Sequence, residues 1–252
     1  MQTAGWSENS LRTGLLLMML ALFGAGVAEA AEPQAERFTH LHVHGPVQVQ
    51  LQQTGEPGVA VPAELADWVV AEIVDGVLYL DAKSGAAAAQ KGTPAGTVVV
   101  TVAKLDSILL GDAGTLDCEG YAGRHLAVEA SGRSVVRLTH LDVDDLSVQG
   151  SGSALFELSG RANHQVVDLV GMGMYQASHL HTYTAQVDAT GAGNLQLHAD
   201  ELLDVRLSGL INVWYAGTPW VTQQISGEGR IVPVANQASE RKPASAPSAI
   251  SI

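Results

Sequence analysis

A corner of small residues, most often Gly-x-Gly, recurs along this chain at nearly constant spacing. It is written GDAG, EASG, QGSG, VGMG, ATGAG, LSGLI and SGEG, and its last residues stand at positions 114, 132, 152, 173, 193, 211 and 229. The steps between them are 18, 20, 21, 20, 18 and 18 residues. A fixed period of this length is the signature of a repeat protein, in which each unit packs only against its neighbours.

Apolar and polar residues alternate on both sides of each corner, which is typical of a strand with one buried face. Aligning the repeats on their corners predicts ladders of stacked inward side chains. Two of these predicted ladders are Val128–Val148–Leu169 and Val136–Phe156–Ala177. The same alignment places Asp168 and Asp188 together in an outward column, with no basic column beside them.

The repeat predicts an all-β fold, a single-domain parallel β-helix or β-solenoid with about seven coils of 18–21 residues. Glycine suits the corner because the chain bends sharply there without a β-carbon in the way. Before the repeat begins, Asp75-Gly76 predicts a tight turn between two strands. A β-sandwich with evenly spaced hairpins is the alternative, but it does not require the same column identities seven times.

The N-terminal segment has the pattern of a signal peptide. Arg12 precedes the apolar run 14–28, and Ala28-Glu29-Ala30 is a small-x-small cleavage site, so we expect cleavage after Ala30. An uncleaved anchor is the alternative, although the run is short and interrupted by glycine. The predicted organisation is a signal peptide at 1–30, a lead at 31–37, the solenoid domain at 38–234 and a disordered tail at 235–252.

Charge and cysteine usage restrict the partners. The formal net charge is −13, so nucleic acid and acidic membrane surfaces are unsuitable, whereas glycans and cell-surface proteins remain possible partners. Cys118 is the only cysteine, so the chain has no intramolecular disulfide, and we expect this thiol to be buried. No motif in the sequence predicts a cofactor.

Histidines alternate with apolar residues in HLHVHG, so His40, His42 and His44 are predicted on one face of a strand. Two imidazoles at this spacing can chelate zinc, and His179 and His181 form a second such pair. A closed site needs further ligands that the sequence does not specify. We therefore predict solvated histidines without a shared metal, and the zinc site is the alternative.

Acidic residues give two further hypotheses. Asp142, Asp144 and Asp145 cluster as calcium ligands do, but they match no known calcium loop, so a charged corner is the simpler interpretation. Asp168 and Asp188 are the pair that a polysaccharide-cleaving β-helix enzyme would need. No nucleophile motif accompanies them, and no catalytic residue is predicted.

Aromatic residues gather near the end of the repeat region. Trp214 and Trp220 are candidates for stacking on a glycan ring, while Tyr215 falls in a predicted core column. The alternative is that these aromatic side chains close the open end of the core. The sequence alone does not decide between the two roles.

The sequence resembles the auto-transporter adhesin head GIN domain family, a group of bacterial exported proteins, over residues 38–234. The stretches that carry the resemblance are HLHVHGPVQVQLQQ, IVDGVLYL, the repeated glycine corners and LSGLINVWYAGTPWVTQQISGEGRI. In the last stretch the matching residues are Tyr215, Gly217, Pro219, Ser226, Gly227 and Gly229. The corners EASG and SGLI depart from the family pattern because each lacks one glycine.

The resemblance implies a β-solenoid outside the cytoplasm, and it implies no catalytic residues. The expected function is therefore a non-enzymatic, exported binding or surface-interaction module, in the periplasm or on the surface of a bacterium. A β-helix enzyme that processes envelope or extracellular polysaccharide is the alternative. A concave site with converging charged groups would favour the enzyme, whereas a flat ladder would favour the binding module.

Overall fold

The structure, a computed structural model, describes residues 37–83 and 96–234. The predicted signal peptide 1–30, the tail 235–252 and nearly all of the predicted lead lie outside these residues. The described chain is almost entirely β, and its one helix is the short 3-10 turn η1 (Ala63–Leu65). Within the same residues, no helix has the length and apolar character needed to cross a membrane.

The strands of the described chain join into one continuous sheet that winds around itself. They are β1 (His40–His44), β2 (Gln48–Gln53), β3 (Gly58–Ala60), β4 (Val69–Val74), β5 (Val77–Ala82), β6 (Val98–Val102), β7 (Ser107–Leu110), β8 (Thr115–Ala130), β9 (Val135–Gly152), β10 (Leu155–Gly171), β11 (Met174–His198), β12 (Leu202–Ala216), β13 (Trp220–Gly227) and β14 (Arg230–Pro233).

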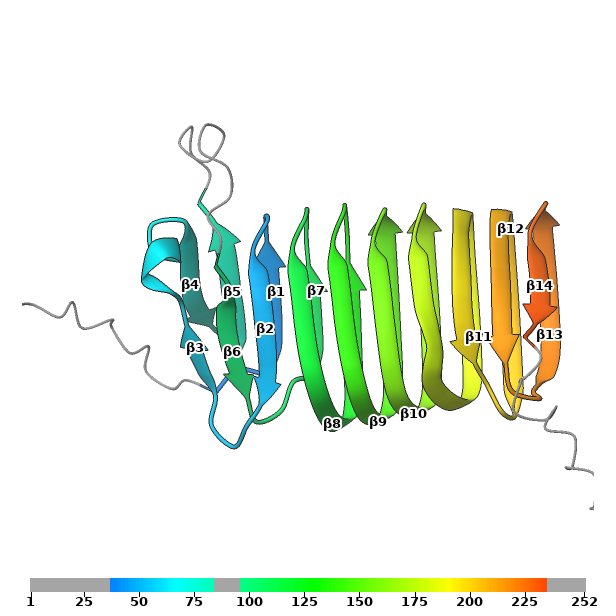
Figure 1. Ribbon diagram of the computed structural model, residues 1–252, viewed down its shortest axis with the longest axis horizontal. Coiled ribbons are helices and arrows are strands. Elements are labelled where there is room, and N and C mark those ends of the chain that lie inside the picture. Colours follow the sequence, from blue (N-terminus) through cyan, green and yellow to red (C-terminus); the bar gives the residue numbers. More distant parts are fainter. Residues whose placement is uncertain (1–36, 84–95, 235–252) are drawn as a thin grey trace, which may run out of the picture. The chain divides into compact units, whose positions relative to one another are not determined.

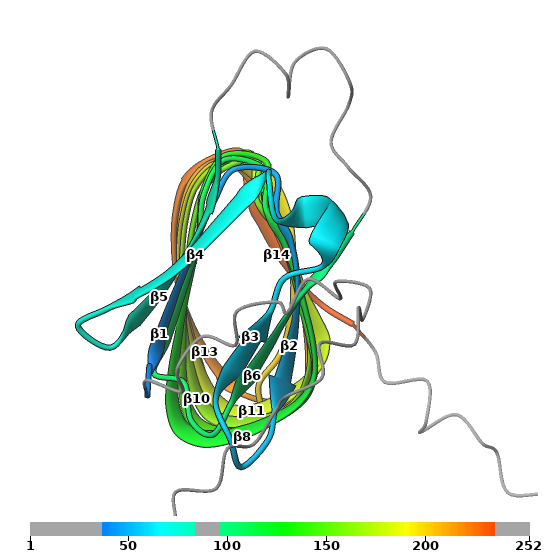
Figure 2. The same ribbon diagram turned by 90° about the vertical axis from the view of Figure 1, so that its left-hand side faces the viewer.

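Each coil has two straight arms that face each other across the core (Figure 1, Figure 2). The first arm is the stack that contains β1, β7 and β13, and the second arm contains β2, β6 and β14. The long strands β8 to β12 belong to both. Strands β8, β9 and β10 run along the second arm, turn through a bend and continue along the first arm of the next coil. Strand β11 does the same and then passes a corner back onto the second arm, whereas β12 runs along the first arm and then the second.

Neighbouring coils pair in parallel register. One inward column of the first arm runs through Ile108, Val128, Val148, Val167, Val187, Val205 and Gln223, in steps of 18 to 20 residues. The described chain makes about six turns, which confirms the predicted parallel β-solenoid and agrees roughly with the predicted number of coils. The predicted Asp75-Gly76 turn is also confirmed, since it joins the antiparallel strands β4 and β5.

Both predicted ladders contain an error of register. Val148 is followed in the next coil by Val167 and not by Leu169, and Phe156 is followed by Tyr175 and not by Ala177. The sequence alignment placed the corners at 132 and 152 two residues out of step with the later ones. Because side chains alternate with a period of two, a slip of two residues leaves every apolar residue inward, so the pattern does not reveal it.

A column of glycines forms the corner that leads from the first arm to the second. Its members have φ between 70° and 125°, a range that favours glycine, and they are Gly132, Gly152, Gly171, Gly191, Gly209 and Gly227. A Cβ added at Gly191 would collide with the carbonyl oxygen of Gly171 one coil earlier. Glycine is required here for two reasons, therefore: the left-handed backbone and the close approach of the next coil.

Inward side chains fill the space between the arms and form one continuous core. Phe156 and Tyr175 are fully buried, and the predicted burial of Cys118 is confirmed. On the outside, Asp168 and Asp188 are direct neighbours, as predicted. Arg206 follows Asp188 in the same column, and the two side chains form an ion pair.

Candidate functional site

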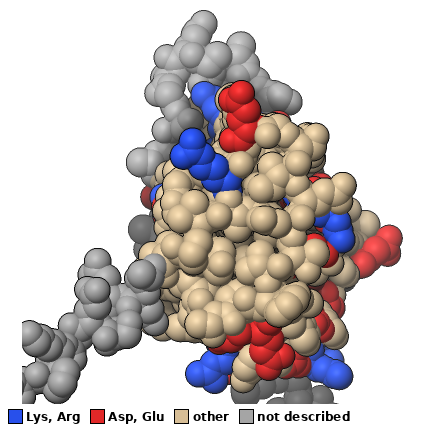
Figure 3. All heavy atoms as spheres, turned by 90° about the vertical axis from the view of Figure 1, so that its right-hand side faces the viewer, with Lys and Arg blue, Asp and Glu red and all other residues tan. Residues whose placement is uncertain are grey.

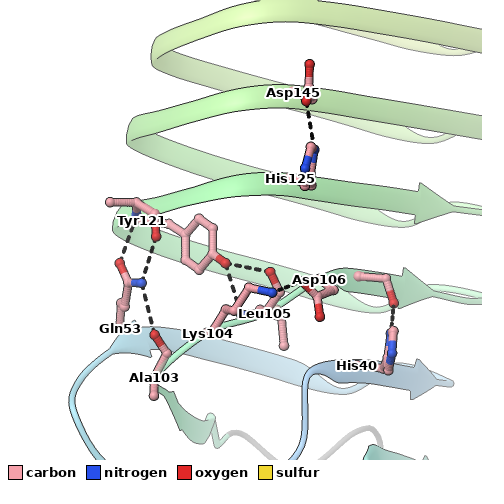
Figure 4. A network of polar contacts seen from close by, with 11 residues as sticks. His40, Gln53, Ala103, Lys104, Leu105, Asp106, Tyr121, His125 and Asp145 are labelled. Atoms are coloured by element: carbon pink, nitrogen blue, oxygen red, sulfur yellow. Dashed lines mark hydrogen bonds and ion pairs between the residues drawn. The ribbon is translucent and has the colours of Figure 1, made fainter.

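The three alternating histidines lie on β1, outward from the core, and each has a different partner. His40 Nδ1 lies 2.6 Å from Ser107 Oγ (Figure 4), and His44 Nδ1 lies 3.0 Å from Asp81 Oδ1. The ring of His42 packs edge-on against Tyr79. Burial lowers the pKa of His42, and nearby His44 and His40 lower it further. In residues 37–83 and 96–234, no three His, Cys, Asp or Glu side chains converge as metal ligands would.

The three clustered aspartates point to separate partners. Asp145 pairs with His125 of the preceding coil at 2.7 Å (Figure 4), and Asp144 accepts a hydrogen bond from Asn163 at 2.9 Å. Asp142 faces a groove described below. The geometry therefore fits the interpretation of a charged corner better than that of a calcium site.

The two tryptophans lie on different arms. Trp214 lies on the second arm beside Gln196 and Val232, whereas Trp220 lies on the first arm beside Leu202 and is 77% exposed. One sugar ring therefore cannot stack on both, and each tryptophan is a separate candidate. The predicted core position of Tyr215 is supported, since this residue packs against the core and is partly buried.

A network of polar contacts at the first bends is structural (Figure 4). The Gln53 side chain donates to the carbonyl oxygens of Ala103 and Ala122, and it accepts from the Ala122 N–H. The hydroxyl of Tyr121 donates to the carbonyl oxygen of Leu105, and burial raises the pKa of this phenol. These contacts satisfy backbone groups where the chain changes direction, so they hold the coils together.

A groove of about 790 Å³ lies at the bend that joins the second arm to the first. This bend groove crosses several neighbouring coils, because its lining comes from β9, β10, β11 and the loop after β11. The lining residues are His140, Leu141, Asp142, Gly160, Arg161, Ala162, His181, Thr182, Tyr183 and Asp200. A groove of this kind presents polar groups from successive coils to one ligand.

One wall of the bend groove is a mixed ladder. The strand register places Arg161 between Asp142 in the coil before and His181 in the coil after. All three side chains are exposed, and Arg161 joins no ion pair with any residue that the structure describes. Neighbouring strands lie about 4.8 Å apart. The carboxylate of Asp142, the guanidinium of Arg161 and the imidazole of His181 therefore lie side by side, at a spacing that one small ligand can span.

The floor of the bend groove is held by buried hydrogen bonds. Tyr175 donates to Gln165 Oε1 at 2.9 Å, and Gln165 Nε2 donates to Thr182 Oγ1 at 3.0 Å. The hydroxyl of Thr182 donates to the carbonyl oxygen of His198. No buried side-chain nitrogen or oxygen of the described residues lacks a hydrogen-bond partner. A fully satisfied network of this kind makes the floor rigid.

A linked pair of histidines lies at the end of this ladder. The rings of His181 and His198 have centroids 4.4 Å apart, and His198 Nε2 lies 2.9 Å from Asp200 Oδ1. His198 is nearly buried, whereas His181 and Asp200 are exposed in the groove. The contact with Asp200 therefore orients His198, which in turn supports the ring of His181.

His140 has an unusual backbone. Its φ is 55°, and the equivalent bend position in the coil before is Gly120, which also has positive φ. In the coil after, the register shifts, so Gly160, again with positive φ, lies opposite Leu141. A residue with a side chain is strained there, although histidine tolerates this conformation better than most residues. The side chain of His140 thus lines the groove from a backbone conformation that glycine adopts without strain.

Of these groove residues, only Asp142 and His181 were candidates from the sequence, and both were candidates for metal ligands. It missed His140, Arg161, Tyr183 and Asp200, because these four share no local motif. The one signal available was histidine at a bend position where the coil before has glycine. That signal becomes readable only after the coils are in correct register.

The fold and this groove define the class of the protein, a parallel β-solenoid with a polar groove along one bend. Residues 37–219 match the family described as "Putative auto-transporter adhesin, head GIN domain", and the chain belongs to that family. The match includes Tyr215, Gly217 and Pro219, and it ends before the corner at Ser226–Gly229. No curated protein is a match for the chain.

Solved structures share the fold. A putative adhesin from Bacteroides fragilis is 19% identical, with 81% of this chain and 95% of that chain covered, at a TM-score of 0.68. A putative lipid binding protein from Parabacteroides distasonis is 18% identical, with the same coverage and a TM-score of 0.61. A putative adhesin from the same species is 20% identical, with coverage of 79% and 93% and a TM-score of 0.60.

Proposed function

We propose that this protein is a non-enzymatic, exported module that binds a carbohydrate ligand in the bend groove. The observation that carries the proposal is the mixed ladder of Asp142, Arg161 and His181 on one wall of an open groove. Membership of an adhesin head family, and structural neighbours named as adhesins, support a binding or surface module.

The chemistry of the groove suits a sugar. Carbohydrate hydroxyls both donate and accept hydrogen bonds, so they can pair with a carboxylate, a guanidinium and an imidazole in one row. Tyr183, which is 50% exposed at the groove, offers an aromatic face for the apolar side of a sugar ring. The rigid floor reduces the entropy cost of binding, because the site is already formed.

Glycan cleavage is the second candidate function, and one observation favours it. Two carboxylates, Asp142 and Asp200, line the same groove, and glycoside hydrolysis uses two carboxylates on either side of the bond. This meets in part the criterion of a concave site with converging charged groups. The binding function is preferred because the groove is open and is lined by an arginine and histidines as well.

Screening of the mature protein on a glycan array tests the binding function. We expect selective binding that is lost in Arg161→Ala and reduced in His140→Gly, while Arg206→Ala on the first arm serves as the matched control and retains binding. His140→Gly should also keep its stability within about 1 kcal/mol, because glycine fits the left-handed backbone. An array without binding, or equal loss in Arg206→Ala, would contradict the proposal.

The two tryptophans provide a further comparison on the same array. Trp214→Ala and Trp220→Ala lie outside the groove, so we expect each variant to bind as the native protein does. Loss of binding in either variant, with Arg161→Ala still active, would move the glycan site to that tryptophan.

The enzyme alternative has its own measurement. Any glycan that binds is incubated with the protein, and the reducing ends released are quantified against Asp142→Asn and Asp200→Asn. We expect no release above background. Release that disappears in both variants while binding persists would establish catalysis instead.

Export is tested by intact mass of the protein recovered from outside the cytoplasm. The proposed mature chain begins at Ala31, because cleavage follows Ala28-Glu29-Ala30. Fractionation of the producing cells then distinguishes the periplasm from the cell surface. Recovery of a chain that retains residues 1–30 would contradict the predicted processing.

A further inference from the structure

The two ends of the described solenoid are finished differently. At the N-terminal end the parallel stacking stops, because β3 pairs with β6, and β4 with β5, in the antiparallel sense (Figure 1, Figure 2). The turn η1 adds Leu65 to the core at this end. These elements cover the first coil.

At the C-terminal end the coil itself is the last layer. Strands β13 and β14 pair only with β12 among the described residues, so their outer backbone groups have no strand beside them. Ile225 is 40% exposed, whereas Leu207, which precedes it in the same inward column, is 3% exposed. Gln223 is exposed as well, although Val205 before it is fully buried. The inward side chains of the last coil are therefore exposed to solvent at the end of the stack.

This end surface carries almost no charge. Strand β13 has no charged residue, and the final coil contributes only Glu228 and Arg230. Figure 3 looks onto this end and shows an uncharged centre with acidic and basic side chains at the rim. An uncharged centre inside a charged rim is the anatomy of a protein interface. Free edge strands in monomers are normally protected by charges, which β13 lacks.

We propose that the C-terminal coil is the docking surface for a second copy of this chain, with β13 of one copy pairing antiparallel to β13 of the other. A two-fold axis across the stack reverses the strand direction, so the pairing is antiparallel and self-complementary. The chain has a net charge of −13, and this surface lets two copies meet without like charges in contact.

Free strand edges on both arms favour a second copy of the chain as the partner at this end. Free edges occur on both arms of the same coil, eight residues long in β13 and four in β14. A single extended peptide covers one arm, whereas another solenoid end offers strands at both arms with the same separation. An overlap centred on Gln223 keeps the inward faces of the two β13 strands together, and it brings Gln223 opposite its copy and Gln224 opposite Thr222 of the other chain. These polar side chains can both donate and accept across that contact.

Light scattering coupled to size-exclusion chromatography of the mature chain tests this proposal. We expect twice the monomer mass for the native protein. The double variant Gln223→Glu/Ile225→Glu places acidic groups at the junction and should raise the dissociation constant by about 100-fold or more. The matched control Gln196→Glu/Val170→Glu adds the same charges on outward faces away from this end and should remain dimeric.

A truncated chain that ends at Val234 tests whether residues 235–252, rather than a second copy, cover this end. A dimer with and without residues 235–252 supports the second copy. A native monomer that dimerises only after removal of 235–252 shows that this segment covers the end, which overturns the proposal. A monomer in both forms overturns it too, as does equal loss of the dimer in the junction and control variants. Melting curves of all variants confirm that each one is folded.

Discussion

The ring of Phe156 lies against the ring of Tyr175 in the next coil, with centroids 6.2 Å apart and planes tilted by 54°. Both side chains are fully buried, and burial strongly raises the pKa of the Tyr175 phenol. Through its hydroxyl Tyr175 also bonds to Gln165, which supports the floor of the bend groove. This pair therefore links the apolar ladder of the second arm to the candidate site.

Removal of the Phe156 ring should destabilise the fold. Phe156→Ala leaves a cavity and should lower the free energy of unfolding by about 3–5 kcal/mol. Asp188→Ala is the surface control and should cost no more than about 0.5 kcal/mol, since its ion pair with Arg206 is largely exposed. Urea denaturation followed by circular dichroism measures both. Equal losses would mean that inward and outward faces have been assigned wrongly.

The glycine corner should resist substitution. Gly191→Ala forces a Cβ into the carbonyl oxygen of Gly171 at a φ of 122°, and we expect a loss of about 1–3 kcal/mol or more. Gly55→Ala is the matched control, because a Cβ there meets no atom within 4 Å. Thermal melting of the two variants compares them. A control that melts as early as Gly191→Ala would argue against a tightly stacked corner.

The single cysteine should be inert in the folded protein. Burial raises the pKa of the Cys118 thiol to about 11, so the reactive thiolate is scarce at pH 8. A thiol reagent such as dithionitrobenzoate should label none of the native protein at pH 8 and one thiol per chain in denaturant. Rapid labelling of the native chain would show that this part of the core opens.

His42 should make stability depend on pH. Its folded pKa is lowered by burial and by His44 and His40, against the opposing charges of Glu129 and Asp81. Below the ordinary value of about 6.5 the unfolded chain therefore binds more protons, so stability is full above that pH and falls as pH decreases. Melting temperatures between pH 7.5 and pH 5 should fall less in His42→Gln than in the native protein. An identical fall in both would contradict this assignment.

Zinc should find no tight site at the same histidines. Titration calorimetry of the native protein is expected to show no stoichiometric binding, because His40 and His44 already have separate partners. The variant with all three histidines replaced by alanine is the control. A sub-micromolar event that disappears in this variant would establish the alternative, a shared zinc site.

Several features of the fold were predictable from local chemistry. The alternation of apolar and polar residues assigned Val128, Val148 and Phe156 inward and Asp188 outward, and the structure confirms these faces. The repeated glycines predicted sharp corners, and Asp75-Gly76 predicted the hairpin turn between β4 and β5. These features depend on a side-chain period of two and on the backbone freedom of glycine, both of which are readable in a short stretch.

The order of stacking was not predictable in the same way. EASG and QGSG use their last glycine at the left-handed corner, whereas GMG and GAG use their first. A slip of two residues keeps every side chain on its face, so the apolar pattern accepts either register. Only the paired backbones of neighbouring coils decide that Phe156 meets Tyr175.

The sequence by itself thus determined a parallel solenoid with an apolar interior, because that outcome depends on a local pattern repeated many times. Tertiary structure alone decided the candidate site. Asp142, Arg161 and His181 are about 20 residues apart in the chain and become neighbours only when three coils stack at one bend. Their juxtaposition depends on the length of every coil between them, and a count of residues along the sequence does not specify where each coil turns.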